Sequence, residues 1–153
     1  MPGILFLIFI FGGFEIFSQV YYLNELETCS FIESEIFENV PKSTLDEMCS
    51  LQFSIKVPSE PTQENIPNQH NEYVNINSFG FRGAEISKEK PENVYRIIML
   101  GGSTLFGYGA TSDETTIPGF LQKKFETTDS DFKVEVINAG SSGAYSKTET
   151  LYV

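Results

Sequence analysis

The feature that most constrains the fold is an apolar run that ends in two glycines and a serine. Residues 97–100 read Ile-Ile-Met-Leu, without polar alternation. Such a run predicts a strand covered on both faces, as in a parallel sheet flanked by helices. Gly101 and Gly102 follow it and allow the backbone to turn sharply. Ligands bind beyond the carboxyl ends of strands in these sheets, so Ser103 is expected where chemistry would occur.

The residues after this serine predict one strand–helix–strand unit. Thr116 precedes an amphipathic segment, 117–125, that has proline at its start and lysines near its end, which predicts a capped helix. Residues 133–137 alternate as a more exposed strand does, and the glycine-rich turn 138–143 follows. The Ser-Lys-Thr-Glu sequence at 146–149 is a capping box that predicts a further helix. Because two strands leave most of their apolar surface uncovered, we expect the amino-terminal part of a longer protein, or one member of a split or truncated pair.

The region before the central strand predicts short helices and a polar connector. Residues 24–39 have apolar positions at close to helical spacing among glutamates, and 43–51 indicate a second short helix. The connector at 58–67 contains three prolines among polar residues. Alternation at 73–77 predicts a short strand. His70, the single histidine, is expected to be a solvated surface residue.

The amino terminus predicts a membrane-targeting segment. Residues 4–14 are apolar without a break, a length that suits a signal-peptide core, and apolar residues continue after Glu15. No small-x-small cleavage site follows, so we favour an uncleaved anchor over a cleaved signal peptide or a buried helix. The expected division is an anchor or signal segment at 1–22, an acidic and partly helical linker at 23–70, and the amino-terminal part of an α/β domain at 71–153.

The charge and the two cysteines exclude several classes of protein. A net charge of -11 argues against nucleic-acid binding, which needs clustered Lys and Arg. Cys29 and Cys49 have no second pair and no nearby histidine, so no zinc site is expected, and no other metal or cofactor is indicated. If this region lies outside the cytosol, the two cysteines could form a disulfide; unpaired thiols in a small apolar cluster are the alternative.

Three known glycine-rich motifs do not fit the serine turn. A phosphate-binding loop needs a lysine after its last glycine, but Tyr108 follows Gly107. The dinucleotide fingerprint fails because the run that begins at Gly107 ends in Ser112. The nucleophile elbow of α/β-hydrolases, Gly-x-Ser-x-Gly, fails at Leu105.

Taken together, three segments resemble the SGNH hydrolase superfamily, also called GDSL esterases. They are Gly-Gly-Ser-Thr after the Arg-Ile-Ile-Met-Leu strand, Asn-Ser-Phe-Gly-Phe-Arg-Gly at 77–83, and Val-Ile-Asn-Ala-Gly-Ser-Ser-Gly at 136–143. The match covers about residues 72–153. A hydrophobic amino-terminal helix with a glutamate near its end is also similar to membrane-anchored members. The resemblance implies a flavodoxin-like three-layer α/β/α fold, here incomplete and preceded by that hydrophobic helix.

The resemblance also implies roles for individual residues. Ser103 matches the nucleophile and would donate its backbone N–H to the oxyanion, and Gly143 matches the glycine that supplies a second backbone donor. Gly102 and Asn138 would support the site, Asn138 by shaping the second turn. The implied reaction is ester hydrolysis through an acyl-enzyme, or acyl transfer to a sugar, at the outer side of the membrane.

Two departures from the family pattern limit this expectation. Gly102 replaces the usual aspartate, a variant found in the membrane-anchored branch. The third-block asparagine and the carboxy-terminal Asp-x-x-His are not in this sequence, so the polypeptide as given should have no catalytic triad. The competing hypothesis is a membrane-tethered accessory module of the same fold that binds an acyl or sugar ligand without turnover.

Overall fold

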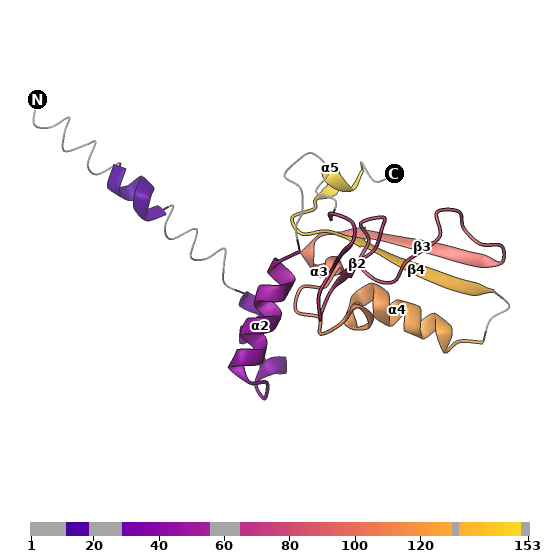
Figure 1. Cartoon of the computed structure of the whole chain (residues 1–153), viewed down its shortest axis with the longest axis horizontal. Helices are drawn as coiled ribbons and strands as arrows, with labels where there is room; N and C mark the ends of the chain where they lie inside the picture. Colours follow the sequence, from indigo (N-terminus) through magenta and orange to yellow (C-terminus); the bar gives the residue numbers. More distant parts are fainter. Residues whose placement is uncertain (1–11, 19–28, 56–64, 130–131, 151–153) are drawn as a thin grey trace, which may run out of the picture.

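A computed structural model describes residues 12–18, 29–55, 65–129 and 132–150, which form a mixed α/β structure (Figure 1). Its elements, in chain order, are the 3-10 helices η1 (Ser30–Glu33) and η2 (Glu35–Phe37), α2 (Lys42–Phe53), β1 (Gln69–His70), β2 (Asn75–Ile76), β3 (Val94–Gly101), α3 (Ser103–Phe106), the 3-10 helix η3 (Asp113–Thr115), α4 (Ile117–Glu126), β4 (Lys133–Gly140) and α5 (Ser146–Glu149).

Most of the predicted membrane segment, 1–22, lies outside the described residues. The part that is described, 12–18, is helical and exposed. Within the described ranges, every helix is too short or too polar to cross a bilayer.

The centre of the structure is the predicted strand–helix–strand unit. β3 and β4 pair in parallel from Val94 opposite Lys133 to Gly101 opposite Gly140, and α4 packs along β4 (Figure 1). The Thr116 hydroxyl accepts the Gly119 N–H at 3.1 Å, so the predicted cap and helix are confirmed. β3 and β4 are both longer than the apolar segments 97–100 and 133–137 from which they were predicted. The carboxyl half of β4 is buried, although the alternation had indicated a more exposed strand.

The expectation that the central strand is covered on both faces is wrong for part of β3. Ile98 is 54% exposed, and Tyr95 is 62% exposed. The register partner of Ile98 on β4 is Ile137, which is only 4% exposed. The covering elements therefore shield β4 at this level and leave β3 open to solvent.

The segment 29–40 folds into two 3-10 turns, so the continuous helix expected over 24–39 is wrong where that range is described. A disulfide joins Cys29 to Cys49 with a Cα–Cα distance of 5.9 Å. It holds η1 against α2, while Phe37 packs into a cluster with Leu45 and Met48 of α2. The apolar spacing therefore reflects turns packed on a neighbouring helix and not one helical stripe.

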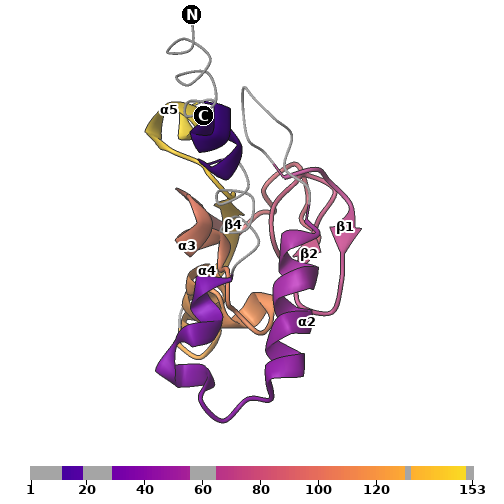
Figure 2. The same cartoon turned by 90° about the vertical axis from the view of Figure 1, so that its left-hand side faces the viewer.

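Helix α2 confirms the helix predicted at 43–51, and it begins at Lys42 after Pro41, without a side-chain cap. Its buried Gln52 donates from Nε2 to the Ala110 carbonyl at 2.8 Å and accepts the Gly109 N–H at Oε1, also at 2.8 Å. Both partners lie in the loop that follows α3. The segment that contains α2 is thereby fastened to the domain that carries Ser103 (Figure 2).

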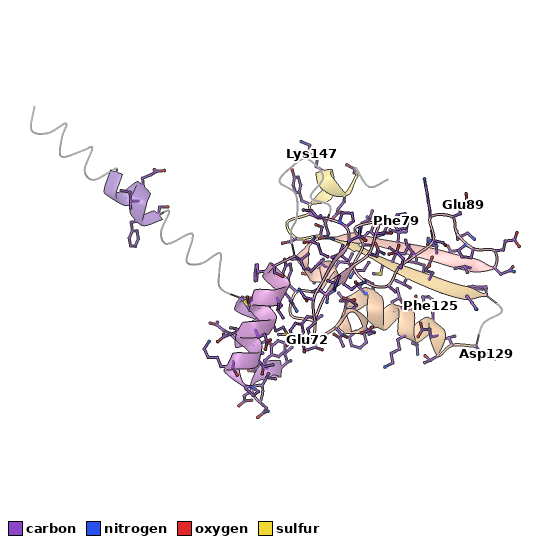
Figure 3. All side chains as sticks on the ribbon, viewed as in Figure 1. Glu72, Phe79, Glu89, Phe125, Asp129 and Lys147 are labelled. Carbon is purple, nitrogen blue, oxygen red and sulfur yellow. A yellow bond between two sulfur atoms is a disulfide. The ribbon has the colours of Figure 1, made fainter. Side chains whose placement is uncertain are left out.

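The remaining predictions are met in part. β1 and β2 form a two-residue antiparallel pair, shorter than the strand predicted at 73–77, and His70 is exposed as expected. α5 begins at Ser146 itself: the Glu149 N–H donates to the Tyr145 carbonyl, so Ser146 lies inside the first turn instead of capping it. Acidic side chains such as Glu72, Glu89 and Asp129 lie on the surface, as the high negative charge requires (Figure 3).

Candidate active site at the strand ends

The two glycine-rich strand ends lie side by side. Gly101 and Gly140 are register partners at the end of the β3–β4 pair. Ser141, the residue after Gly140, donates its N–H to the Gly101 carbonyl at 3.0 Å. The chain then turns through Gly143, whose φ of 75° is a left-handed conformation that favours glycine.

Ser103 is the first residue of α3, a single helical turn, and its side chain is exposed. The Ser103 carbonyl accepts the N–H groups of Gly107 at 3.0 Å and Tyr108 at 3.2 Å. Gly107 closes the turn in a left-handed conformation with φ 96°. The hydroxyl therefore stands at the surface, while the backbone behind it is fixed.

Close packing explains why two glycines precede the serine. A Cβ on Gly101 would come within 2.8 Å of the Leu105 Cβ, and one on Gly102 would come within 3.0 Å of the Ala144 carbonyl oxygen. The second contact joins the two candidate turns, because Ala144 follows Gly143. The chain that carries the predicted donor Gly143 thus reaches the residue that precedes Ser103.

Asn138 lies deeper in β4 and is buried. Its Oδ1 accepts the Gly140 N–H at 3.0 Å, and its Nδ2 donates to the Phe106 carbonyl at 3.2 Å. These bonds connect the end of β4 to the last residue of α3. They are the contacts of a residue that shapes the turn, the role that the resemblance implies for it.

The serine has no base within the described residues. No histidine or carboxylate there is hydrogen-bonded to Ser103, and His70 lies on β1. A serine hydroxyl is a weak nucleophile until a base accepts its proton. Within the described residues, Ser103 therefore has no neighbouring group that could activate its hydroxyl.

The sequence did not single out the buried polar side chains that hold these turns. Arg82 is 3% exposed, and its Nε is paired with the Asp113 Oδ1 at 2.8 Å. Asn65, also 3% exposed, donates from Nδ2 to the carbonyls of Gly80 and Gly140, each at 3.1 Å. Arg82 falls within the segment 77–83 that carried the family resemblance, but Asn65 lies inside the polar connector 58–67 and no pattern distinguishes it.

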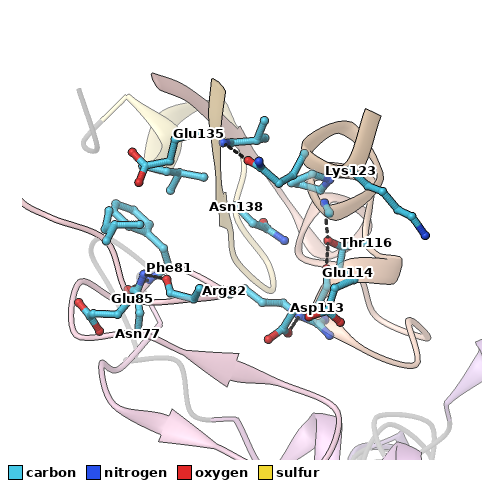
Figure 4. Close-up of a pocket in the computed structure, with 18 of the residues that line it drawn as sticks. Asn77, Phe81, Arg82, Glu85, Asp113, Glu114, Thr116, Lys123, Glu135 and Asn138 are labelled. Carbon is cyan, nitrogen blue, oxygen red and sulfur yellow. Dashed lines mark hydrogen bonds and ion pairs between the residues drawn. The ribbon is translucent and has the colours of Figure 1, made fainter. Parts of the chain in front are cut away.

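A well-formed cavity lies away from Ser103. It measures about 640 Å³ and lies between α4, the outer side of β4 and the segment after Asn77 (Figure 4). Apolar walls come from residues such as Phe81 and Val136, and the rim includes Glu85 and Glu114.

Hydrogen bonds hold both rim carboxyl groups in the ionised form. The Ser78 hydroxyl and N–H lower the pKa of Glu85, the hydroxyl having the larger effect. The Ser112 side chain is the main cause that lowers the pKa of Glu114. The rim is therefore negatively charged at neutral pH. Within the described ranges, no cluster of His, Cys, Asp and Glu side chains is suited to hold a metal ion.

No protein-family model matches this sequence, and no curated protein matches it.

Proposed function

We propose that this chain supplies the nucleophile of an SGNH-type serine esterase in the membrane-anchored branch of that superfamily. The substrate would be a small-molecule or carbohydrate ester, and acyl transfer to a sugar would use the same first step. The observation that carries the proposal is the pairing of the two glycine-rich strand ends, which brings the residue after Gly143 against the residue before Ser103.

In the proposed reaction, the Ser103 hydroxyl attacks the ester carbonyl and its proton passes to a histidine base. The negative charge on the tetrahedral intermediate would be held by the N–H groups of Ser103 and Gly143. Departure of the alcohol leaves an acyl-enzyme, which water or a sugar hydroxyl then cleaves. The resemblance implies that the base belongs to a carboxy-terminal Asp-x-x-His block.

Two further observations support the proposal. The disulfide between Cys29 and Cys49 fits a location outside the cytosol, because disulfides persist in oxidising compartments. The outward backbone groups of Ile98 and Leu100 on β3 are bonded by no described residue, so the additional strands of a flavodoxin-like sheet could pair there. An anchor at residues 1–22 would hold the domain at the outer face of the membrane.

The second candidate is a membrane-tethered module that binds a ligand without turnover. The observation that favours it is that the cavity between α4 and β4, with its acidic rim, lies away from Ser103. Such a module would need no base at the serine turn.

A fluorophosphonate probe distinguishes the two candidates, because it labels only an activated serine. The assay uses the longest polypeptide that the gene encodes, in membranes. We expect labelling of the unmodified protein and at least a 100-fold loss in Ser103→Ala, since no other group takes over the nucleophile's role. Ser142→Ala, which changes a serine in the adjacent turn, should keep its labelling. Labelling that persists in Ser103→Ala, or that is absent from the unmodified protein, would contradict the esterase proposal.

A further inference from the structure

The buried guanidinium of Arg82 contacts the far end of the one-turn helix that begins at Ser103. Its Nη1 donates to the carbonyls of Phe106 at 3.1 Å and Gly107 at 3.0 Å. Its Nη2 donates to the Tyr73 carbonyl at 2.8 Å, and the guanidinium carbon Cζ lies 5.0 Å from the centre of the Phe106 ring. The side chain is completely shielded from solvent. We infer that Arg82 is a positioning residue for Ser103; this inference rests on the esterase proposal.

The two carbonyls that Arg82 holds have no partner within a helix as short as α3. A single turn is not stable by itself, because nucleation costs more than one hydrogen bond returns. The carbonyl groups at the end of a helix also need partners from elsewhere. Arg82 supplies one partner to each carbonyl, beside the Asn138 Nδ2 that also donates to Phe106 and the Ala110 N–H that also donates to Gly107. It also brings a positive charge, which is favourable at a helix C-terminus.

The bonds of α3 connect Arg82 to Ser103. Gly107, whose carbonyl accepts from Arg82, donates its own N–H to the Ser103 carbonyl, as does Tyr108. If the arginine is lost, Phe106 and Gly107 can move, and the backbone of Ser103 can move with them. A displacement of this kind raises the barrier for attack by the serine hydroxyl, since reaction requires a narrow range of geometry.

The arrangement requires arginine and not simply a cation. One planar guanidinium reaches the Asp113 carboxylate, the adjacent carbonyls at the end of α3 and the Tyr73 carbonyl in separate directions. A lysine ammonium is a compact charge on a flexible stem, so it cannot occupy all four positions. Asp113 neutralises the buried charge, which would otherwise be costly to desolvate.

The chain offers a matched control in Arg96. This arginine is also mostly buried and is also paired with a carboxylate, Glu135, on the neighbouring strand. Its other bonds go to the carbonyls of Ser87 and Lys88 and to the Ser87 hydroxyl, none of which belongs to α3. Arg96→Lys therefore makes the same chemical change in a comparable setting without touching the serine turn.

The experiment compares Arg82→Lys with Arg96→Lys in the longest polypeptide that the gene encodes. In native-state hydrogen exchange, Arg82→Lys should speed exchange of the Gly107 and Tyr108 amides by about tenfold relative to Ile137 in β4, because about one net hydrogen bond is lost. The fluorophosphonate labelling rate should fall by about tenfold at an unchanged half-saturating probe concentration, as expected when only the reactive geometry is lost. Arg96→Lys should change neither the exchange of these two amides relative to Ile137 nor the labelling rate.

The outcomes separate this inference from the esterase proposal. Labelling that survives Ser103→Ala would refute the proposed nucleophile, whatever Arg82→Lys does. Normal dependence of labelling on Ser103, combined with unchanged exchange at Gly107 and Tyr108 in Arg82→Lys, would refute the positioning role alone. A uniform rise in exchange across the protein would also refute it, because this indicates general destabilisation. If Arg82→Lys does not fold, Asp113→Asn must show the same selective change.

Discussion

The outer edge of β4 and the outer edge of β3 belong to the same two-stranded sheet, but their backbone groups have different partners. In a parallel pair, alternate residues direct their N–H and C=O groups outward. On β4, the partners come from three other parts of the chain: the Gln122 side chain at Val134 and Val136, the Arg82 backbone at Asn138, and the Asn65 side chain at Gly140. On β3, the Val94 carbonyl accepts from Lys90, and no described residue bonds the outward backbone groups of Ile98 and Leu100.

The difference shows that this sheet can be extended on one side only. An edge whose backbone groups are already bonded cannot accept another strand, whereas an edge with free N–H and C=O groups can. The β4 edge is closed by the same polar residues that hold the candidate site, Arg82 and Asn65. The residues that close the β4 edge therefore also help to place the serine turn. Substitutions at the β4 edge should lower the free energy of unfolding more than equivalent substitutions at β3.

The largest effect is expected from Asn65→Ala. The change removes the buried donor to the Gly80 and Gly140 carbonyls, and each buried group without a partner costs roughly 1–3 kcal/mol. We expect the free energy of unfolding, measured by urea denaturation, to fall by about 3 kcal/mol. Thr128→Ala removes a comparable but exposed bond, to the Lys124 carbonyl, and should cost less than about 0.5 kcal/mol. Equal losses in the two variants would show that burial at the closed edge does not matter.

A smaller effect is expected from Gln122→Ala, which opens the other half of the β4 edge. The Gln122 amide accepts the Val136 N–H at 2.7 Å and donates to the Val134 carbonyl at 3.1 Å. Because this site is only partly buried, water replaces part of the lost hydrogen bonding. The free energy of unfolding should therefore fall by about 1 kcal/mol. Exchange of the Val136 amide should accelerate selectively. Lys123→Ala, at the next and exposed position, should leave that amide unchanged; acceleration in both variants would mean that α4 as a whole has loosened.

The contrast between the two edges also explains how much of the structure could be predicted from the sequence. Local patterns predicted β3, the serine turn, the Thr116 cap and α4, because each depends on neighbouring residues. The closure of β4 depends on contacts between distant positions, such as Asn65 with Gly140. Nothing in the residues around Asn65 distinguishes it from a solvated asparagine. The expectation of two covered faces was wrong at Ile98 for a related reason. An apolar run shows that a strand can be buried on both faces, but it does not show which elements cover those faces.

An effect of similar size is expected from a matched pair of changes at Ile137 and Ile98, which compares how the side chains of the two strands are covered. These residues are register partners on the same face of the sheet, but Ile137 is 4% exposed and Ile98 is 54% exposed. Removing one methyl group from a packed core costs about 0.5–1.5 kcal/mol, whereas at a half-exposed site most of that cost disappears. Ile137→Val should therefore lower the free energy of unfolding by about 1 kcal/mol, and Ile98→Val by less than about 0.3 kcal/mol. If Ile98→Val instead costs as much as Ile137→Val, the side chain of Ile98 must be covered in solution, and this face of β3 would not be open to solvent.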